Sequence, residues 1–200
     1  GGLTLDVTAH PEFAQAEADE QQVNLTQFSQ FFPEKRDFFL ENSGLFYVGD
    51  AARNNRVNPT PTPDEDLLLF FSRRIGLSAG GLPIPILGGV RLSGRAGNTS
   101  IGTLTLQTRR SDSDPANNFS VLGLRQNVLA GSDIGVIAMP RQSADDRSDY
   151  NRVLGADANV RFFGSVDWNS YLIRTVTPGI NDDQYAWRTT LNREGNFLHV

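Results

Sequence analysis

The feature that most constrains the fold is a regular alternation of apolar and polar residues in the second half of the chain. The clearest stretch is 153–162, VLGADANVRF. Side chains of a strand point to opposite faces in turn, so this stretch has one apolar and one polar face. The apolar face carries Leu154, Ala156, Ala158, Val160 and Phe162, and the polar face carries Gly155, Asp157, Asn159 and Arg161. The alternation predicts a strand between an apolar medium and water.

Similar stretches follow one another from residue 88 to residue 200, joined by connections of alternating length. Tight turns are predicted at 94–98, 130–133, 163–165 and 193–196, and longer polar loops at 109–117, 142–149 and 177–183. Short turns on one side, long loops on the other and strands of about 9–12 residues are typical of outer-membrane β-barrels. Two further sets of residues fit this reading. Arg91, Arg125, Asp157, Arg161 and Arg188 fall on the polar, lumen-facing side, and Trp168, Tyr171, Tyr185 and Trp187 lie near strand ends, as in an aromatic girdle.

The predicted fold class is all-β, an antiparallel meander forming a partial transmembrane β-barrel. Residues 1–200 are expected to be part of one β-barrel domain and a fragment of a larger barrel. Its first strand is predicted at 3–9, and residues 10–87 form an irregular plug-like region, lumenal or loop. The meander occupies residues 88–200.

Composition excludes several function classes. With Lys+Arg 18 against Asp+Glu 23, the net charge of −5 disfavours a nucleic-acid partner. Cys 0 rules out disulfides, thiol catalysis and cysteine metal sites. His10 and His199 are the two histidines, so neither a Ser/His/Asp triad nor a histidine metal site is expected. We therefore predict no catalytic residues, no metal and no cofactor. No stretch approaches the ~18–20 apolar residues of a membrane helix.

The most distinctive segment is 23–46, in which phenylalanines flank a charge cluster. Charges between apolar residues usually need internal partners. We expect a plug or lining segment held by salt bridges inside the lumen, or alternatively a ligand site built from the same charges. Its predicted members are Glu34, Lys35, Arg36, Glu41, Arg73 and Arg74. Removing one partner of a buried pair costs about 3–5 kcal/mol, so neutralising Glu34 should destabilise the plug.

A resemblance starts from the same segment, VNLTQFSQFFPEKRDFFLENSGLF, with EFAQAEADEQQ before it and FFSRRIG and GGVRLSGRAG after it. These phrases resemble an uncharacterised bacterial β-barrel family whose members commonly carry a family 9 carbohydrate-binding-like domain before a C-terminal domain of unknown function. Asp37 stands where the family more often has proline. The resemblance implies a Gram-negative outer-membrane location, a carbohydrate-binding-like domain before Gly1 and further strands after Val200. It implies no catalytic residues.

The function predicted from the sequence is a segment of a Gram-negative outer-membrane β-barrel, serving envelope passage or binding of a saccharide-type ligand. Its expected partners are outer-membrane lipid, a saccharide ligand and the remaining strands of the parent chain, with no nucleic acid. The alternative is a soluble β-sandwich that binds or hydrolyses glycans. Glu34 and Glu41 are the nearest candidates for its paired carboxylates. A role in secretion or assembly machinery is not separable from these two on the sequence.

Overall fold

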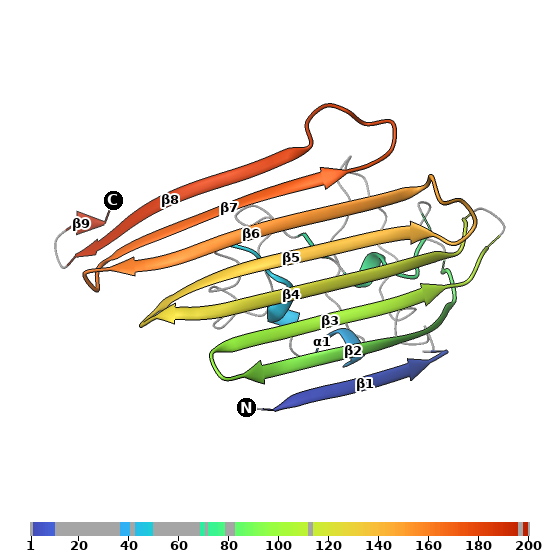
Figure 1. Ribbon diagram of the computed structural model, residues 1–200, viewed down its shortest axis with the longest axis horizontal. Coiled ribbons are helices and arrows are strands. Elements are labelled where there is room, and N and C mark those ends of the chain that lie inside the picture. The colour runs from blue at the N-terminus through green and yellow to red at the C-terminus, as the bar shows by residue number, and fades with distance from the viewer. Residues whose placement is uncertain are drawn as a thin grey trace, which may run out of the picture.

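A computed structural model describes residues 2–10, 37–40, 43–49, 69–70, 72–78, 83–111, 114–195 and 198–199. Eight strands form one antiparallel sheet in which each strand pairs with the next in sequence (Figure 1). The strands are β1 (Leu3–Ala9), β2 (Ile86–Ala96), β3 (Thr99–Thr108), β4 (Asn117–Leu129), β5 (Ser132–Ser143), β6 (Tyr150–Phe162), β7 (Val166–Val176) and β8 (Tyr185–Gly195). The predicted antiparallel meander is confirmed. The sheet is not closed, because β1 lies at one edge and β8, with the short β9 at its end, lies at the other.

The remaining described elements are short. The two-residue β9 (Leu198–His199) pairs with the end of β8. One turn of α-helix, α1 (Asp37–Leu40), and two 3₁₀ turns, η2 (Ser43–Phe46) and η3 (Ser72–Arg74), lie between β1 and β2 in the chain. No helix in the described part of the chain is long and apolar enough to cross a membrane.

The connections between strands separate by length, as predicted. Tight turns at 97–98, 130–131 and 163–165 lie at one end of the sheet, here called the turn end. The longer connections at 109–116, 144–149 and 177–184 lie at the other, the loop end (Figure 1). Gly97 and Gly131 have φ values of 60° and 75°, a left-handed conformation in which glycine has no steric penalty.

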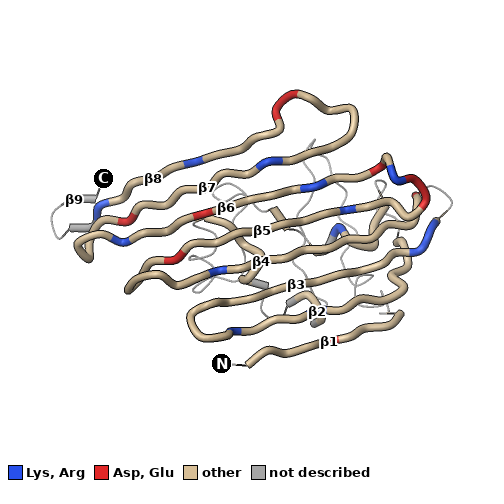
Figure 2. Tube along the Cα trace, in the orientation of Figure 1, with Lys and Arg blue, Asp and Glu red and all other residues tan. Residues whose placement is uncertain are grey.

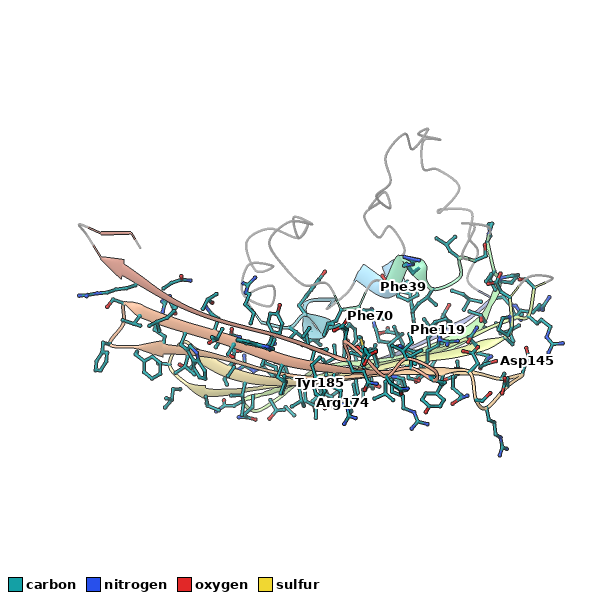
Figure 3. All side chains as sticks on the ribbon, turned by 90° about the horizontal axis from the view of Figure 1, so that it is seen from above. Phe39, Phe70, Phe119, Asp145, Arg174 and Tyr185 are labelled. Carbon is teal, nitrogen blue, oxygen red and sulfur yellow. The ribbon has the colours of Figure 1, made fainter. Side chains whose placement is uncertain are left out.

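The two faces of the sheet differ in what covers them. The short elements α1, η2 and η3 lie on one face, here called the inner face, on the side where Figure 3 labels Phe39 and Phe70. Arg174 and Tyr185 are labelled on the opposite, outer face. Among the described residues, nothing covers the outer face.

A hydrophobic core fills the loop-end half of the inner face. Phe39, Phe46, Val48 and Ile75 contribute to it from the segments above the sheet, with Phe70 packed against them. The strands contribute Ile86, Leu104, Leu106, Val121, Ile137 and Ile173. The rings of Phe46 and Phe70 meet edge to face with centroids 5.2 Å apart. The core therefore joins the sheet to the chain between β1 and β2.

Two glycines let η2 approach the sheet closely. A Cβ built on Gly123 would lie 2.5 Å from the carbonyl oxygen of Leu45, and one on Gly102 would lie 3.0 Å from the Leu45 Cβ. Real Cβ contacts essentially never fall below 3.0 Å. These glycines lie opposite each other on β3 and β4. The close packing of η2 on β3 and β4 therefore requires that these two positions carry no side chain.

The outer face exposes large apolar side chains on every strand of the eight except β3. Trp187 is 72% exposed, Val7 71% and Leu191 68%. Further exposed apolar residues on this face are Leu3, Leu5, Val90, Leu122, Ile134, Val136, Leu154, Phe162, Leu172 and Tyr185. In sequence, β3 carries no charged residue and β4 carries Arg125 alone; Figure 2 colours the charged residues along the chain.

Candidate functional site

The inner face holds a cavity of about 350 Å³ near the loop end. Its walls are mostly apolar and come from the segments above the sheet and from β4, β5 and β6. The lining includes Leu69, Phe70, Ile75, Phe119, Met139 and Val153. Arg74, Arg141 and Asn151 add polar groups. An apolar cavity with a few convergent polar groups is the usual form of a small-molecule site.

Arg141 is held at this cavity by two strands and a loop. Its Nη1 donates to Asn117 Oδ1 at 2.8 Å and to Asp149 Oδ2 at 3.2 Å, and its Nη2 lies 2.5 Å from Asp149 Oδ1. The hydrogen bond from Arg141 holds the pKa of the Asp149 carboxyl below its ordinary value. Asn151 donates to Thr177 Oγ1 at 2.7 Å. The polar side of the cavity is thus fixed by the loop-end connections.

A second ion pair joins two of these loops. Arg110 Nη2 lies 2.5 Å from Asp145 Oδ1, and the Asp145 carboxylate also accepts the backbone N–H of Ala116 at 3.1 Å. The hydrogen bond from Arg110 lowers the pKa of the Asp145 carboxyl. The connection 109–116 is therefore tied to the connection 144–149 next to the cavity.

Toward the turn end, the inner face is ionic. Arg125 pairs with Asp133, and its Nη1 lies 3.0 Å from Asp157 Oδ2. Asn159 donates from Nδ2 to Asp133 at 2.9 Å and to Asp157 at 3.3 Å. Arg161 pairs with Asp167 at 2.7 Å. Neighbouring strands place these side chains together because Gly135 pairs with Asp157 and Asp133 with Asn159.

The strand arginines also bind the backbone of the segment above them. Arg125 Nη2 donates to the carbonyl oxygen of Tyr47 at 3.1 Å, and Asp157 accepts a hydrogen bond from the Gly49 N–H. Arg91, 2% exposed, donates to the carbonyl oxygen of Phe38 and pairs with Asp6 on β1 at 2.8 Å. Its guanidinium carbon lies 5.4 Å from the centroid of the Phe38 ring. Polar groups of the sheet thus hold segment 37–49 at both ends.

The predicted charge network falls mostly outside the described residues. Glu34, Lys35, Arg36 and Glu41 lie outside them, and of Arg73 only the backbone, in η3, is described. Arg74 is exposed and lines the cavity. The structure therefore tests neither the network nor the alternative ligand site.

Sequence reasoning placed the strand charges on one face, and Arg91, Arg125, Asp157 and Arg161 share the inner face in the structure. It missed the cavity residues Arg141, Asn151 and Met139. A sequence feature that could have indicated Arg141 is its position just before the charged loop 142–149, which contains its partner Asp149. Tyr171 was assigned to a girdle, but it lies on the inner face beside Gly49, whose added Cβ would meet its ring at 3.0 Å.

The described residues contain no group of three or more His, Cys, Asp or Glu side chains arranged to hold a metal ion. Each carboxylate named in the inner-face network is engaged by an arginine or asparagine. This arrangement can position chain segments and bind a ligand in the cavity.

Comparison with known proteins gives a match to one family model over part of the chain. Residues 1–83 match the model of a family described as a domain of unknown function (DUF5916). The match includes β1 and the segments that pack on the inner face, and ends before β2. No curated protein and no solved structure matches the chain.

Proposed function

We propose that this sheet forms part of the wall of a Gram-negative outer-membrane β-barrel, with its outer face in lipid and its inner face toward the lumen. The observation that carries the proposal is the outer face, which exposes large apolar side chains on each of the strands β1 to β8 except β3. Contiguous apolar surface of this extent usually marks contact with a protein or a membrane. The inner face, in contrast, carries Asp6, Arg91, Arg125, Asp133 and Asp157.

The height of the apolar band supports the lipid assignment. On β6 it runs from Leu154 to Phe162, with Arg152 and Tyr150 beyond it at the loop end. At about 3.3 Å per residue, this stretch is about 26 Å long, which corresponds to a height of about 22 Å for a strand tilted by about 35°. Outer-membrane barrels have an apolar band about 25 Å tall between aromatic girdles. Tyr150, Tyr185 and Trp187 lie at the loop end of this face, and Phe162 and Trp168 lie near the turn end.

The register of the strands also supports a barrel wall. Paired residues trace a line across seven strands through Leu92, Thr103, Leu122, Ala138, Leu154, Arg174 and Tyr185. This line starts four residues before Ala96, the turn end of β2, and finishes ten residues before Gly195, the turn end of β8. A stagger of about one residue per strand, with strands about 4.8 Å apart, gives a tilt of about 35°. Closed barrels have tilts of about 35–45°.

The proposal requires further strands. Unpaired backbone groups are not tolerated in lipid, so the outward edges of β1 and β8 must be hydrogen-bonded. We propose that strands of a larger barrel supply these partners. Segments 37–49 and 69–78 would then lie inside the lumen as part of a plug, held there by the contacts of Arg91 and Arg125.

The ligand we propose is of the saccharide type, bound at the inner-face cavity or passing along it. Phe70 and Phe119 provide apolar surface, while Arg141 and Asn151 provide polar groups. The charge network of Glu34, Lys35, Arg36, Glu41, Arg73 and Arg74 is proposed as a lumenal neighbour, since Arg74 lines the cavity. If Glu34→Gln left the heat-resistant mobility of the full-length protein and its ligand passage unchanged, the network would have no such role.

The experiment that tests the barrel is made on the full-length protein. Cell envelopes are fractionated, the protein is extracted in detergent, and its gel migration is compared with and without heating. The proposal predicts recovery in the outer-membrane fraction and a heat-dependent shift in migration. Recovery in the soluble fraction without a shift would contradict it and favour a soluble β-sandwich.

A further inference from the structure

The outer face carries a small and distinctive set of charges. By alternation, the charged residues on this face of the described strands are Arg152 on β6, Arg174 on β7 and Arg193 on β8. All three are arginines, and each lies near a strand end. Arg152 and Arg174 share the loop end, whereas Arg193 lies at the turn end.

Arg152 and Arg174 are neighbours across two strands. Arg174 pairs with Leu154 and Val176 pairs with Arg152, so the two arginines are diagonal in the register. Diagonal residues on one face lie about 7–8 Å apart, a separation that two long side chains can bridge. Both arginines are exposed. One small group at the surface can therefore reach both guanidinium groups.

Each of these guanidinium groups is placed over a tyrosine. The guanidinium carbon of Arg152 lies 4.5 Å from the Tyr150 ring centroid, and that of Arg174 lies 5.5 Å from the Tyr185 centroid. A ring on one side of the guanidinium restricts its rotamers and leaves its N–H donors directed outward. The tyrosines thus preorganise the two cations at the border of the apolar band.

These two arginines differ from those of the inner face in their partners. Arg91, Arg125, Arg141 and Arg161 each pair with an aspartate. Within the described ranges, neither Arg152 nor Arg174 has a carboxylate within ion-pair distance. Two adjacent, oriented and uncompensated cations at the edge of an apolar surface fit an anionic group from outside the chain.

We propose that Arg152 and Arg174 bind the phosphate group of a membrane lipid headgroup. This inference rests on the proposed function, because the outer face must be in lipid. Guanidinium groups match phosphate oxygens in a bidentate, charge-assisted geometry. The apolar band directly beside the pair, including Leu154 and Leu172, provides the surface for the acyl chains of the same lipid. A lipid therefore satisfies both features of the site, whereas a free anion satisfies one.

The test is native mass spectrometry of the full-length protein in detergent, titrated with phosphatidic acid. Phosphatidylcholine, whose phosphate is capped by choline, is the comparison lipid, and inorganic phosphate is the competitor. The variant is Arg152→Gln with Arg174→Gln, and the matched control is Arg193→Gln at the turn end. We expect the double variant to weaken phosphatidic acid binding at least about tenfold, since charge-assisted hydrogen bonds are lost. Arg193→Gln should change it less than about twofold.

Three results would overturn the inference: a double variant that binds like the parent, equal binding of phosphatidylcholine, or displacement of the lipid by an equal concentration of inorganic phosphate. Heat-dependent gel migration of each sample shows whether the lipid-site inference alone is wrong or whether the barrel proposal is wrong as well. A sample that shifts on heating while the double variant binds normally overturns the lipid site alone. A sample without the shift overturns both.

Discussion

At the scale of single residues, arginines organise the inner face by binding acids and backbone together. Arg125 engages Asp133, Asp157 and the Tyr47 carbonyl, and Arg91 engages Asp6 and the Phe38 carbonyl. The side chains of Arg125 and Asp157 are 12% and 1% exposed. A charge buried to this extent needs its partner, because an uncompensated charge in the interior is costly.

Replacing Arg125 by methionine should destabilise the protein strongly. Asp133 and Asp157 would stay buried without their cation, at a cost of about 3–5 kcal/mol in the free energy of unfolding. Denaturant titration in a lipid or detergent host measures this loss. Arg95→Met is the control: Arg95 is exposed and donates to the Gly97 carbonyl, so its loss should cost less than about 0.5 kcal/mol. Equal effects of the two substitutions would refute the role of the buried network.

At the scale of elements, η2 depends on the glycines beneath it. Gly123→Ala would place a methyl group 2.5 Å from the Leu45 carbonyl oxygen, so η2 or β4 must shift. Overpacking of this kind costs about 1–3 kcal/mol. Faster amide hydrogen exchange at residues 47–49 should report the displaced segment. Gly44→Ala, whose Cβ meets nothing within 4 Å, should leave the exchange unchanged. Unchanged exchange in Gly123→Ala would contradict the close contact.

The loop-end connections should loosen in acid. The pKa values of Asp145 and Asp149 are lowered by Arg110 and Arg141 respectively. Groups with a depressed folded pKa stabilise the fold above the ordinary aspartate pKa of about 3.9, and this contribution is lost as the pH falls through the folded pKa. Exchange of the Ala116 amide, corrected for intrinsic rate, should therefore rise below about pH 4. In Asp145→Asn this rise should be absent; a rise of the same size would contradict the assignment.

The elements also show how far sequence reasoning reaches. Period-two alternation predicted β1 with its observed bounds. It also placed the even-numbered residues from Leu154 to Phe162 on one face, because side chains of a strand point to opposite faces in turn. It predicted neither the cavity nor the hydrogen bond from Arg125 to the Tyr47 carbonyl. These two residues are 78 positions apart in the sequence. Alternation reports the faces of one strand. Contacts between distant segments depend on register and on gaps such as those at Gly102 and Gly123.

At the scale of the whole molecule, the described residues cover one face of the sheet and leave the other uncovered. Its hydrophobic core, the ion pairs of Arg91, Arg125 and Arg161, and the described parts of segments 37–49 and 69–78 lie on the inner face (Figure 3). A covered outer face in a sandwich and a lipid-facing wall in a barrel would have the same alternation of residues. The two folds differ in what the outer face contacts: another layer of protein in a sandwich, and lipid in a barrel. Identifying this contact therefore distinguishes the two folds.

The most direct measurement is a spin-label scan along β6 in the full-length protein reconstituted in lipid. The chain contains no cysteine, so single cysteines at Leu154, Ala156, Ala158, Val160 and Arg161 give specific labels. The barrel account predicts that labels at the even-numbered positions collide often with oxygen and rarely with a water-soluble nickel chelate. The ratio of the two collision rates should be highest near the middle of the apolar band. The label at 161, an exposed position on the inner face, should depart from this series. Outer-face labels that are freely accessible to the nickel chelate, or shielded equally from both reagents, would contradict the account.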